Sequence, residues 1–164
     1  MPKNRTDVSY TRVKFIGGTP QQKISRFSMG DSHEKFEYAV SLVALSKADI
    51  KHDALEAARI AANKVVDEKL GATGYFLQIC VYPHQIIREH KLMGFAGADR
   101  LSEGMRHSFG KASGRAARVK VDQKVLTIHV NKDQIEVAKT ALKRATSKLP
   151  IPYKITVEQL NQTV

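Results

Sequence analysis

The sequence predicts an α+β fold, a two-layer sandwich in which two long helices cover one face of a mixed, mostly antiparallel sheet. Several segments alternate apolar and polar side chains with the period of a strand, and two segments carry the three-to-four spacing of an amphipathic helix. The chain has 164 residues, of which 42% are hydrophobic. That length and composition fit one domain with a hydrophobic core.

Residues 1–23 predict an extended basic arm, because glycines and a proline interrupt any regular element. Besides Lys23 at its end, its cations are Lys3, Arg5, Arg12 and Lys14. Asp7 is the one acid, and Tyr10 and Phe15 lie among the cations. Such a segment can stack aromatic rings on bases while its cations meet phosphates. A frayed terminus is the alternative interpretation. We expect one further domain over residues 24–164.

Two strands are expected after the arm. Side chains alternate over residues 24–29, which predicts a short strand before Gly30. The run YAVSLVAL at 38–45 is mostly apolar and partly β-branched, and it predicts a longer strand.

The segment ALEAARIAANKVV, residues 54–66, predicts a helix whose apolar side chains share one face. These side chains are Leu55, Ala58, Ala62, Val65 and Val66. Asp53 is expected as the N-cap with Glu56 as its capping-box partner, and Gly71 is expected to end the helix. Its near balance of charge indicates a core-packing helix.

The run YFLQICVY at 75–82 predicts a strand that ends at Pro83 and buries Tyr75, Leu77, Ile79 and Val81. Cys80 falls on the opposite face, and we expect an inert thiol. It is the one cysteine in the chain, so no internal disulfide is possible. A reducing compartment is consistent with that, and we expect a cytoplasmic protein.

Two strands at 118–121 and 125–130 are expected to form a hairpin over a turn at Asp122 and Gln123. In the second strand, His129 lies on the opposite face from the apolar side chains, which indicates a solvent-side or RNA-side histidine. A helix over 132–148 follows, with Asn131 as its cap and Pro150 at its end. The segment YKITVEQL, residues 153–160, predicts a final strand.

Between Gly94 and Gly114 the chain holds five of its ten glycines, and between Arg100 and Lys120 it holds six lysines and arginines against one glutamate. Backbone entropy opposes a stable core element of this composition. We therefore predict a long projecting basic loop over 95–117. A solvated loop without function is the alternative.

Three enzyme-like patterns fail on their spacing. Gly104, Gly110 and Lys111 have one residue too many for a P-loop, and Ala112 follows the lysine. The GxxG at 94–97 is flanked by strand-like sequence. His84 and His90 have no third ligand nearby. We therefore expect that the protein is not an enzyme and that it binds no metal ion and no cofactor.

The charge points to nucleic acid. Lysine and arginine number 27 against 16 aspartates and glutamates, a formal net charge of +11. An imbalance of this size favours an anionic partner such as RNA. No apolar run approaches the roughly 20 residues of a membrane span, and no signal peptide is evident. We expect no membrane partner.

Four segments carry a resemblance to a known family, and the last is the most specific. They are IGGTPQQKISRFSMG at 16–30, ALEAARIAANK at 54–64, VYPHQIIREHKLM at 81–93 and AGADRLSEGMRHSFGK at 96–111. The chain resembles the universal large-subunit ribosomal protein called sixteen in bacteria and ten-e in archaea and eukaryotes. It lacks the longer C-terminal extension of eukaryotic members, so it looks archaeal.

The resemblance implies a two-layer ribosomal protein that lies on large-subunit rRNA beside the aminoacyl-tRNA site, with neighbouring ribosomal proteins as partners and without homo-oligomers. The loop is expected to project toward tRNA, and its tip residues are Arg100, Met105, Arg106, His107, Phe109, Gly110 and Lys111. The residues expected to bind rRNA are Arg5, Arg12, Lys14, Arg26, Arg88, Lys91, Arg115, Arg118 and Lys120.

Two other functions stay open. One is a free-standing RNA-binding or chaperone module, which would not occur in one copy per large subunit. The other is an RNA-processing enzyme that uses His107 with Asp99 or Glu103, which would show turnover on RNA.

Overall fold

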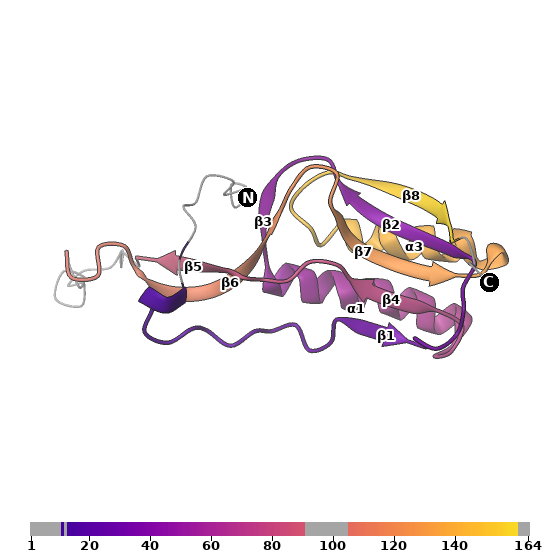
Figure 1. Ribbon diagram of the computed structural model, residues 1–164, viewed down its shortest axis with the longest axis horizontal. Helices are drawn as coiled ribbons and strands as arrows, with labels where there is room; N and C mark the ends of the chain where they lie inside the picture. The colour runs from indigo at the N-terminus through magenta and orange to yellow at the C-terminus, as the bar shows by residue number, and fades with distance from the viewer. Residues whose placement is uncertain (1–10, 12, 91–104, 161–164) are drawn as a thin grey trace, which may run out of the picture.

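The computed structural model describes residues 11, 13–90 and 105–160, and in these ranges it contains two antiparallel sheets and two long helices (Figure 1). The predicted α+β class and the antiparallel pairing are confirmed. The strands divide, however, between two sheets where a single sheet was expected.

The larger sheet has five strands in the order β1-β4-β7-β2-β8. Their bounds are Ser28–Gly30 (β1), Phe76–Ile79 (β4), Lys124–Val130 (β7), Tyr38–Ala44 (β2) and Tyr153–Gln159 (β8). The smaller sheet has the order β3-β6-β5, with bounds Ala48–Lys51 (β3), Lys111–Val119 (β6) and Gln85–Glu89 (β5). The strands expected over 38–45, 75–82, 125–130 and 153–160 are all present with somewhat different bounds.

The two sheets share one bent ribbon. β2 continues into β3, β6 continues into β7, and β2 pairs with β7 while β3 pairs with β6. At the bend, Ala44 N–H donates to the Gln123 carbonyl (3.0 Å) and Asp122 N–H donates to the Ala44 carbonyl (2.9 Å). These two bonds connect the end of β2 to the turn between β6 and β7, where one sheet gives way to the other.

The predicted hairpin between 118–121 and 125–130 is wrong. A turn does occur at Asp122, whose φ is 60°, but β6 and β7 pair with other strands. β7 lies between β4 and β2, where Leu126 and Ile128 are fully buried. Burial of these side chains between two partners stabilises β7 more than pairing with β6 at a sheet edge would.

Two helices supply the second layer. α1 (His52–Leu70) and α3 (Ile135–Thr146) pack against each other, and a 3₁₀ turn (Lys132–Gln134) precedes α3. The helix predicted over 54–66 is confirmed, with Gly71 at its C-cap (φ 74°), and the one predicted over 132–148 is confirmed with shorter bounds. In the described part of the chain, neither helix is both long and apolar enough to cross a membrane.

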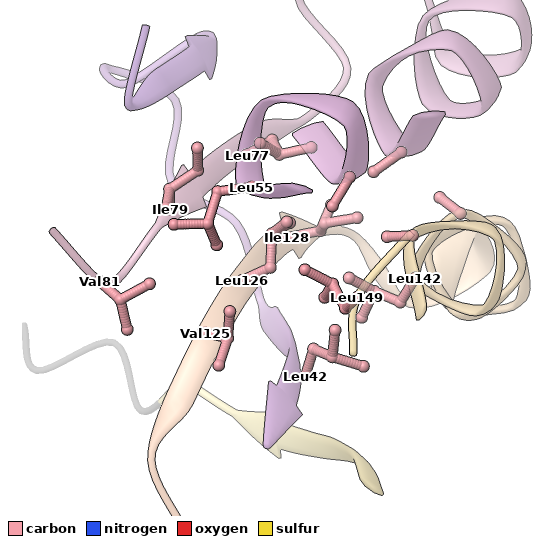
Figure 2. Packing of buried hydrophobic residues seen from close by; sticks show 14 of the residues in the cluster. Leu42, Leu55, Leu77, Ile79, Val81, Val125, Leu126, Ile128, Leu142 and Leu149 are labelled. Carbon is pink, nitrogen blue, oxygen red and sulfur yellow. The ribbon is translucent and has the colours of Figure 1, made fainter. Parts of the chain in front are cut away.

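The predicted core faces are confirmed, and they meet between the helices and the larger sheet (Figure 2). All five predicted apolar side chains of α1 are buried, as are Leu142 of α3 and Leu149 after it. From the sheet, Leu42, Leu77 and Leu126 fill the same core. Cys80 directly follows β4 and is exposed, while Ile79 and Val81 on either side of it are buried, which agrees with the predicted alternation.

The predicted start of α1 is wrong. β3 runs directly into the helix, so Lys51 is the N-cap and its side chain makes no capping hydrogen bond. Glu56 instead accepts hydrogen bonds from Arg59 (Nε–Oε2 2.9 Å) and from Ser25 (Oγ–Oε1 3.2 Å). The Arg59 guanidinium holds the pKa of Glu56 below its usual range. This network fastens the segment before β1 to α1.

Substitution of the core leucine Leu42 by alanine should lower the free energy of unfolding by about 2–5 kcal/mol, because the cavity removes buried contacts from the centre of the larger sheet. Leu45 is the matched control, since it is 48% exposed and Leu45→Ala should change stability by less than about 0.5 kcal/mol. Denaturant unfolding of both variants measures the difference. Equal losses would contradict the core assignment.

Candidate nucleic-acid interface

The β5–β6 hairpin extends away from the helices to one end of the molecule (Figure 1). Residues 91–104, within the predicted loop, lie outside the described residues. Residues 111–117 are strand and not loop, which corrects the expectation there. β6 pairs with β5 over residues 111–116 and with β3 over residues 116–119, so strand pairing orders its whole length despite its many small residues. Composition alone could not reveal those neighbours.

The described end of the hairpin is a tight turn over residues 105–110. Ser108 N–H donates to the Met105 carbonyl (3.2 Å), and Gly110 N–H donates to the His107 carbonyl (2.7 Å). His107 has a φ of 57°, and the ring Nδ1 of His90 donates to its carbonyl oxygen (3.2 Å). These bonds define the path of the backbone back into β6.

Gly110 is required by this geometry. Its φ is 79°, and a Cβ atom there would lie 2.5 Å from the carbonyl carbon of Glu89. A side chain would therefore meet backbone atoms of the opposite strand, which cannot move without breaking the hairpin.

The turn presents apolar and cationic groups to solvent. Met105 is 86% exposed and Phe109 is 78% exposed. The Arg88 guanidinium lies 5.6 Å from the centre of the Phe109 ring, a cation–π contact. Arg106, His107 and Lys111 are also exposed, Gly110 is half-buried, and Arg100 lies outside the described residues. Exposed rings and cations of this kind suit contact with bases and phosphates.

Part of the predicted arm lies against the hairpin. Thr11 N–H donates to Gln85 Oε1 (3.4 Å), and Arg115 Nη2 donates to Thr19 Oγ1 (3.1 Å). Between them, the 3₁₀ turn η1 (Val13–Phe15) carries Lys14, whose ammonium lies 5.0 Å from the Phe15 ring centre. These two bonds hold the segment 11–19 against the β5–β6 hairpin. Lys14 lies in this segment, and Arg88 and Arg115 lie in the hairpin.

The remaining predicted rRNA-binding residues lie elsewhere. Arg118 makes a two-bond ion pair with Asp49 (2.9 and 3.1 Å), and the Asp49 side chain is only 6% exposed. The Arg118 guanidinium therefore stabilises the pairing of β6 with β3. Lys120 is exposed beside the bend, and Arg26 is exposed on the segment before β1. Arg5, Arg12 and Lys91 lie outside the described residues.

A cavity at the base of the hairpin was missed by the sequence reasoning. It has a volume of about 360 Å³, and Lys23, Lys51 and Arg115 line it beside His52 and Asp53. Burial lowers the pKa of His52, and the three cations lower it further against the opposing effect of Asp53. Arg115 was predicted to bind rRNA, but its proximity to Lys23 and Lys51 was not predicted, because these three residues are far apart in the sequence.

Within the described ranges, no group of three or more histidine, cysteine, aspartate or glutamate side chains is placed to hold a metal ion. The His84 ring lies 4.5 Å from that of Tyr82, and His90 bonds to the turn. His129 is half-buried against Phe76 (5.6 Å between ring centres), and burial lowers its pKa.

Comparison with known proteins decides the family. Residues 4–156 match the family described as ribosomal protein L16p/L10e. The chain belongs to the L16p/L10e family. It is 50% identical over 151 residues to the large ribosomal subunit protein uL16 of Staphylothermus marinus, covering 92% of this chain and 87% of that protein. Identity to the proteins of the same name is 48% over 159 residues in Methanocella arvoryzae (97% and 92% covered) and 47% over 153 residues in Hyperthermus butylicus (93% and 85%).

The resemblance seen in the sequence is confirmed, including its archaeal character, because these relatives are archaeal. L16p/L10e proteins are structural proteins of the large ribosomal subunit and are not enzymes, and they act in the cytoplasm. The enzyme alternative with His107 is therefore set aside.

Gly110→Ala should open the end of the hairpin, at a cost of about 1–3 kcal/mol, because the new methyl group meets the Glu89 backbone and the φ is unfavourable. The matched control is Gly17→Ala, since a Cβ at Gly17 meets nothing within 4 Å. Amide hydrogen exchange across β5 and β6 measures the change. Unchanged exchange in Gly110→Ala would contradict this geometry.

Proposed function

We propose that this chain is a constituent of the large ribosomal subunit that binds large-subunit rRNA near the aminoacyl-tRNA site and helps to position tRNA. The observation that carries the proposal is the exposed turn at the end of the β5–β6 hairpin, where Met105, Arg106 and Phe109 project beyond the folded core. The names of the relatives and the net charge of +11 support the same conclusion.

The mechanism divides the work between the core and its extensions. The two-layer core supplies a rigid shape that fits between rRNA helices. Cations on the arm and hairpin, such as Lys14 and Arg88, neutralise phosphates that would otherwise repel each other. Shape selects the site, and charge supplies much of the affinity. Partners are rRNA, neighbouring ribosomal proteins and the tRNA, without homo-oligomers.

The hairpin end is suited to tRNA because its rings are not used by the core. Phe109 and Met105 can lie against a base or ribose, while Arg88 stays close to the Phe109 ring. The tip residues are thus available to a ligand that arrives after the core has bound.

A free-standing RNA-binding module is the alternative function. The number of copies bound per large subunit distinguishes the two. A ribosomal protein co-sediments in one copy per large subunit, whereas a free-standing module does not. The family membership favours the ribosomal function.

Reconstitution tests the proposal. Large subunits are stripped of the native protein by salt, and either the full chain or a variant with residues 99–109 replaced by a short linker is added back. That replacement ends before β6 and leaves the core intact. We expect both proteins to rebind, but only the full chain to restore tRNA accommodation and peptide-bond formation.

Two outcomes would contradict this division. Failure of the full chain to rebind would reject the ribosomal assignment. Loss of thermal stability in the shortened variant would show that the hairpin end supports the fold rather than tRNA.

Affinity for large-subunit rRNA should fall by orders of magnitude from low to moderate salt if roughly six to ten phosphates are contacted. Lys14→Gln should lower the slope of log affinity against log salt by about one unit, because it removes one exposed cation from the arm, which is expected to bind rRNA. Lys143→Gln on the exposed face of α3 is the charge-matched control and should leave the slope unchanged. Filter binding across a salt series measures both slopes. Equal slopes for the two variants would argue against contact between the arm and rRNA.

A further inference from the structure

The cavity at the base of the hairpin is built from three parts of the chain. The extended segment 20–23 forms one wall, the first turn of α1 forms a second, and β5 and β6 form the third through Ile87 and residues 113–115. Its volume of about 360 Å³ lies within the range of small-ligand sites, roughly 300–1,000 Å³. The space can therefore accept a group of nucleotide size.

The lining is positively charged. Lys23, Lys51 and Arg115 face one carboxylate, that of Asp53. Lys23 is paired with Asp53 at 3.1 Å, but no described carboxylate forms an ion pair with Lys51 or Arg115. Two cations are thus left without an anion at the walls of one cavity, which favours an anionic ligand.

Arg115 has a buried N–H donor, its Nε, that makes no hydrogen bond within the described part of the chain. Its Nη2 donates to Thr19 Oγ1 (3.1 Å), whereas its Nε is buried and has no hydrogen-bond partner within the described part of the chain. A buried unpaired donor on a cation is costly, and a nearby anion would offset part of that cost. A guanidinium presents its N–H groups in a fork that matches the oxygens of a phosphate.

The start of α1 adds further donors. Its N-cap, Lys51, has extended backbone and provides no side-chain capping bond. The first N–H groups of a 19-residue helix are therefore uncapped by that side chain, and the helix dipole favours negative charge at this end. An anion in the cavity could act as the cap.

Gly114 and His52 lie together in the lining of the cavity. Gly114 lines the cavity, and a Cβ there would lie 3.7 Å from Nε2 of the buried His52, an ordinary contact. The backbone N–H of Lys23 donates to His52 Nδ1 (3.4 Å), which fits a neutral ring and fixes it in place. Alanine at this position would narrow the site without a clash.

We propose that this cavity binds a phosphate group through Arg115, Lys51 and the start of α1. Its source in the ribosome is a backbone phosphate of rRNA, an assignment that rests on the proposed function. The bound phosphate would join the arm segment, α1 and the hairpin, so that RNA binding and the position of the hairpin are linked.

Nuclear magnetic resonance on the ¹⁵N-labelled full chain tests the proposal. Inorganic phosphate and a ten-nucleotide single-stranded RNA without terminal phosphates are titrated separately. The Arg115 Nε–H resonance and the Gly114 amide are followed. Both probes should shift these resonances. Gly114→Ala and Arg115→Gln should weaken phosphate binding about tenfold, as followed at the Lys51 amide, while Lys143→Gln leaves it unchanged.

The outcomes separate the two levels of the proposal. Shifts with RNA alone would support a site that binds a phosphate only as part of an RNA backbone. Shifts with inorganic phosphate alone would overturn rRNA as the source of the phosphate. No shift with either probe, or equal affinity in Gly114→Ala and the unaltered chain, overturns the site. If filter binding shows that the chain binds large-subunit rRNA while the cavity resonances stay fixed, the proposed function stands and this inference fails.

Discussion

The bent ribbon formed by β2–β3 and β6–β7 is the constraint on which the rest of the structure depends. One half of the ribbon is the centre of the five-stranded sheet and is buried under α1 and α3. The other half is the start of the projecting hairpin. The bonds between Ala44 and residues 122–123 join the two halves at the bend. The position of the hairpin therefore depends on the core through these bonds and through the short connections from β2 to β3 and from β6 to β7.

This arrangement separates two kinds of charge. Charges close to the core have protein partners: Arg59 pairs with Glu56, and Arg118 pairs with the nearly buried Asp49. Charges on the arm and hairpin, such as Arg106, are exposed. Burying an unpaired charge is costly, whereas an exposed cation keeps its charge available for phosphate. A net charge of +11 thus coexists with a conventional hydrophobic core.

Periodicity predicted the elements but not their partners. The buried face of α1 and the alternation over residues 75–82 depend on local spacing, and the structure confirms both. β6 and β7 are adjacent in the sequence, and for that reason they were predicted to form a hairpin. Each instead pairs with strands that are distant in the sequence, and local spacing does not identify those partners. Asp53 was predicted as the N-cap because its spacing to Glu56 fits a capping box, yet the helix begins two residues earlier, with Lys51 as its N-cap, and Arg59 binds Glu56. The family resemblance named the turn residues Met105 and Phe109 as exposed tip residues, whereas the cavity depends on three segments that only the fold brings together.

The central claim is that the arm and hairpin end, not the outer face of α3, meets RNA. Lysine acetylation of intact large subunits, compared with the isolated chain by mass spectrometry, tests it most directly. Lys14 and Lys51 should be protected in the subunit, while Lys143 and Lys148, exposed at the far side of α3 and just beyond it, should react as in the isolated chain. Protection of Lys143 and Lys148 with free reaction of Lys14 and Lys51 would contradict the account.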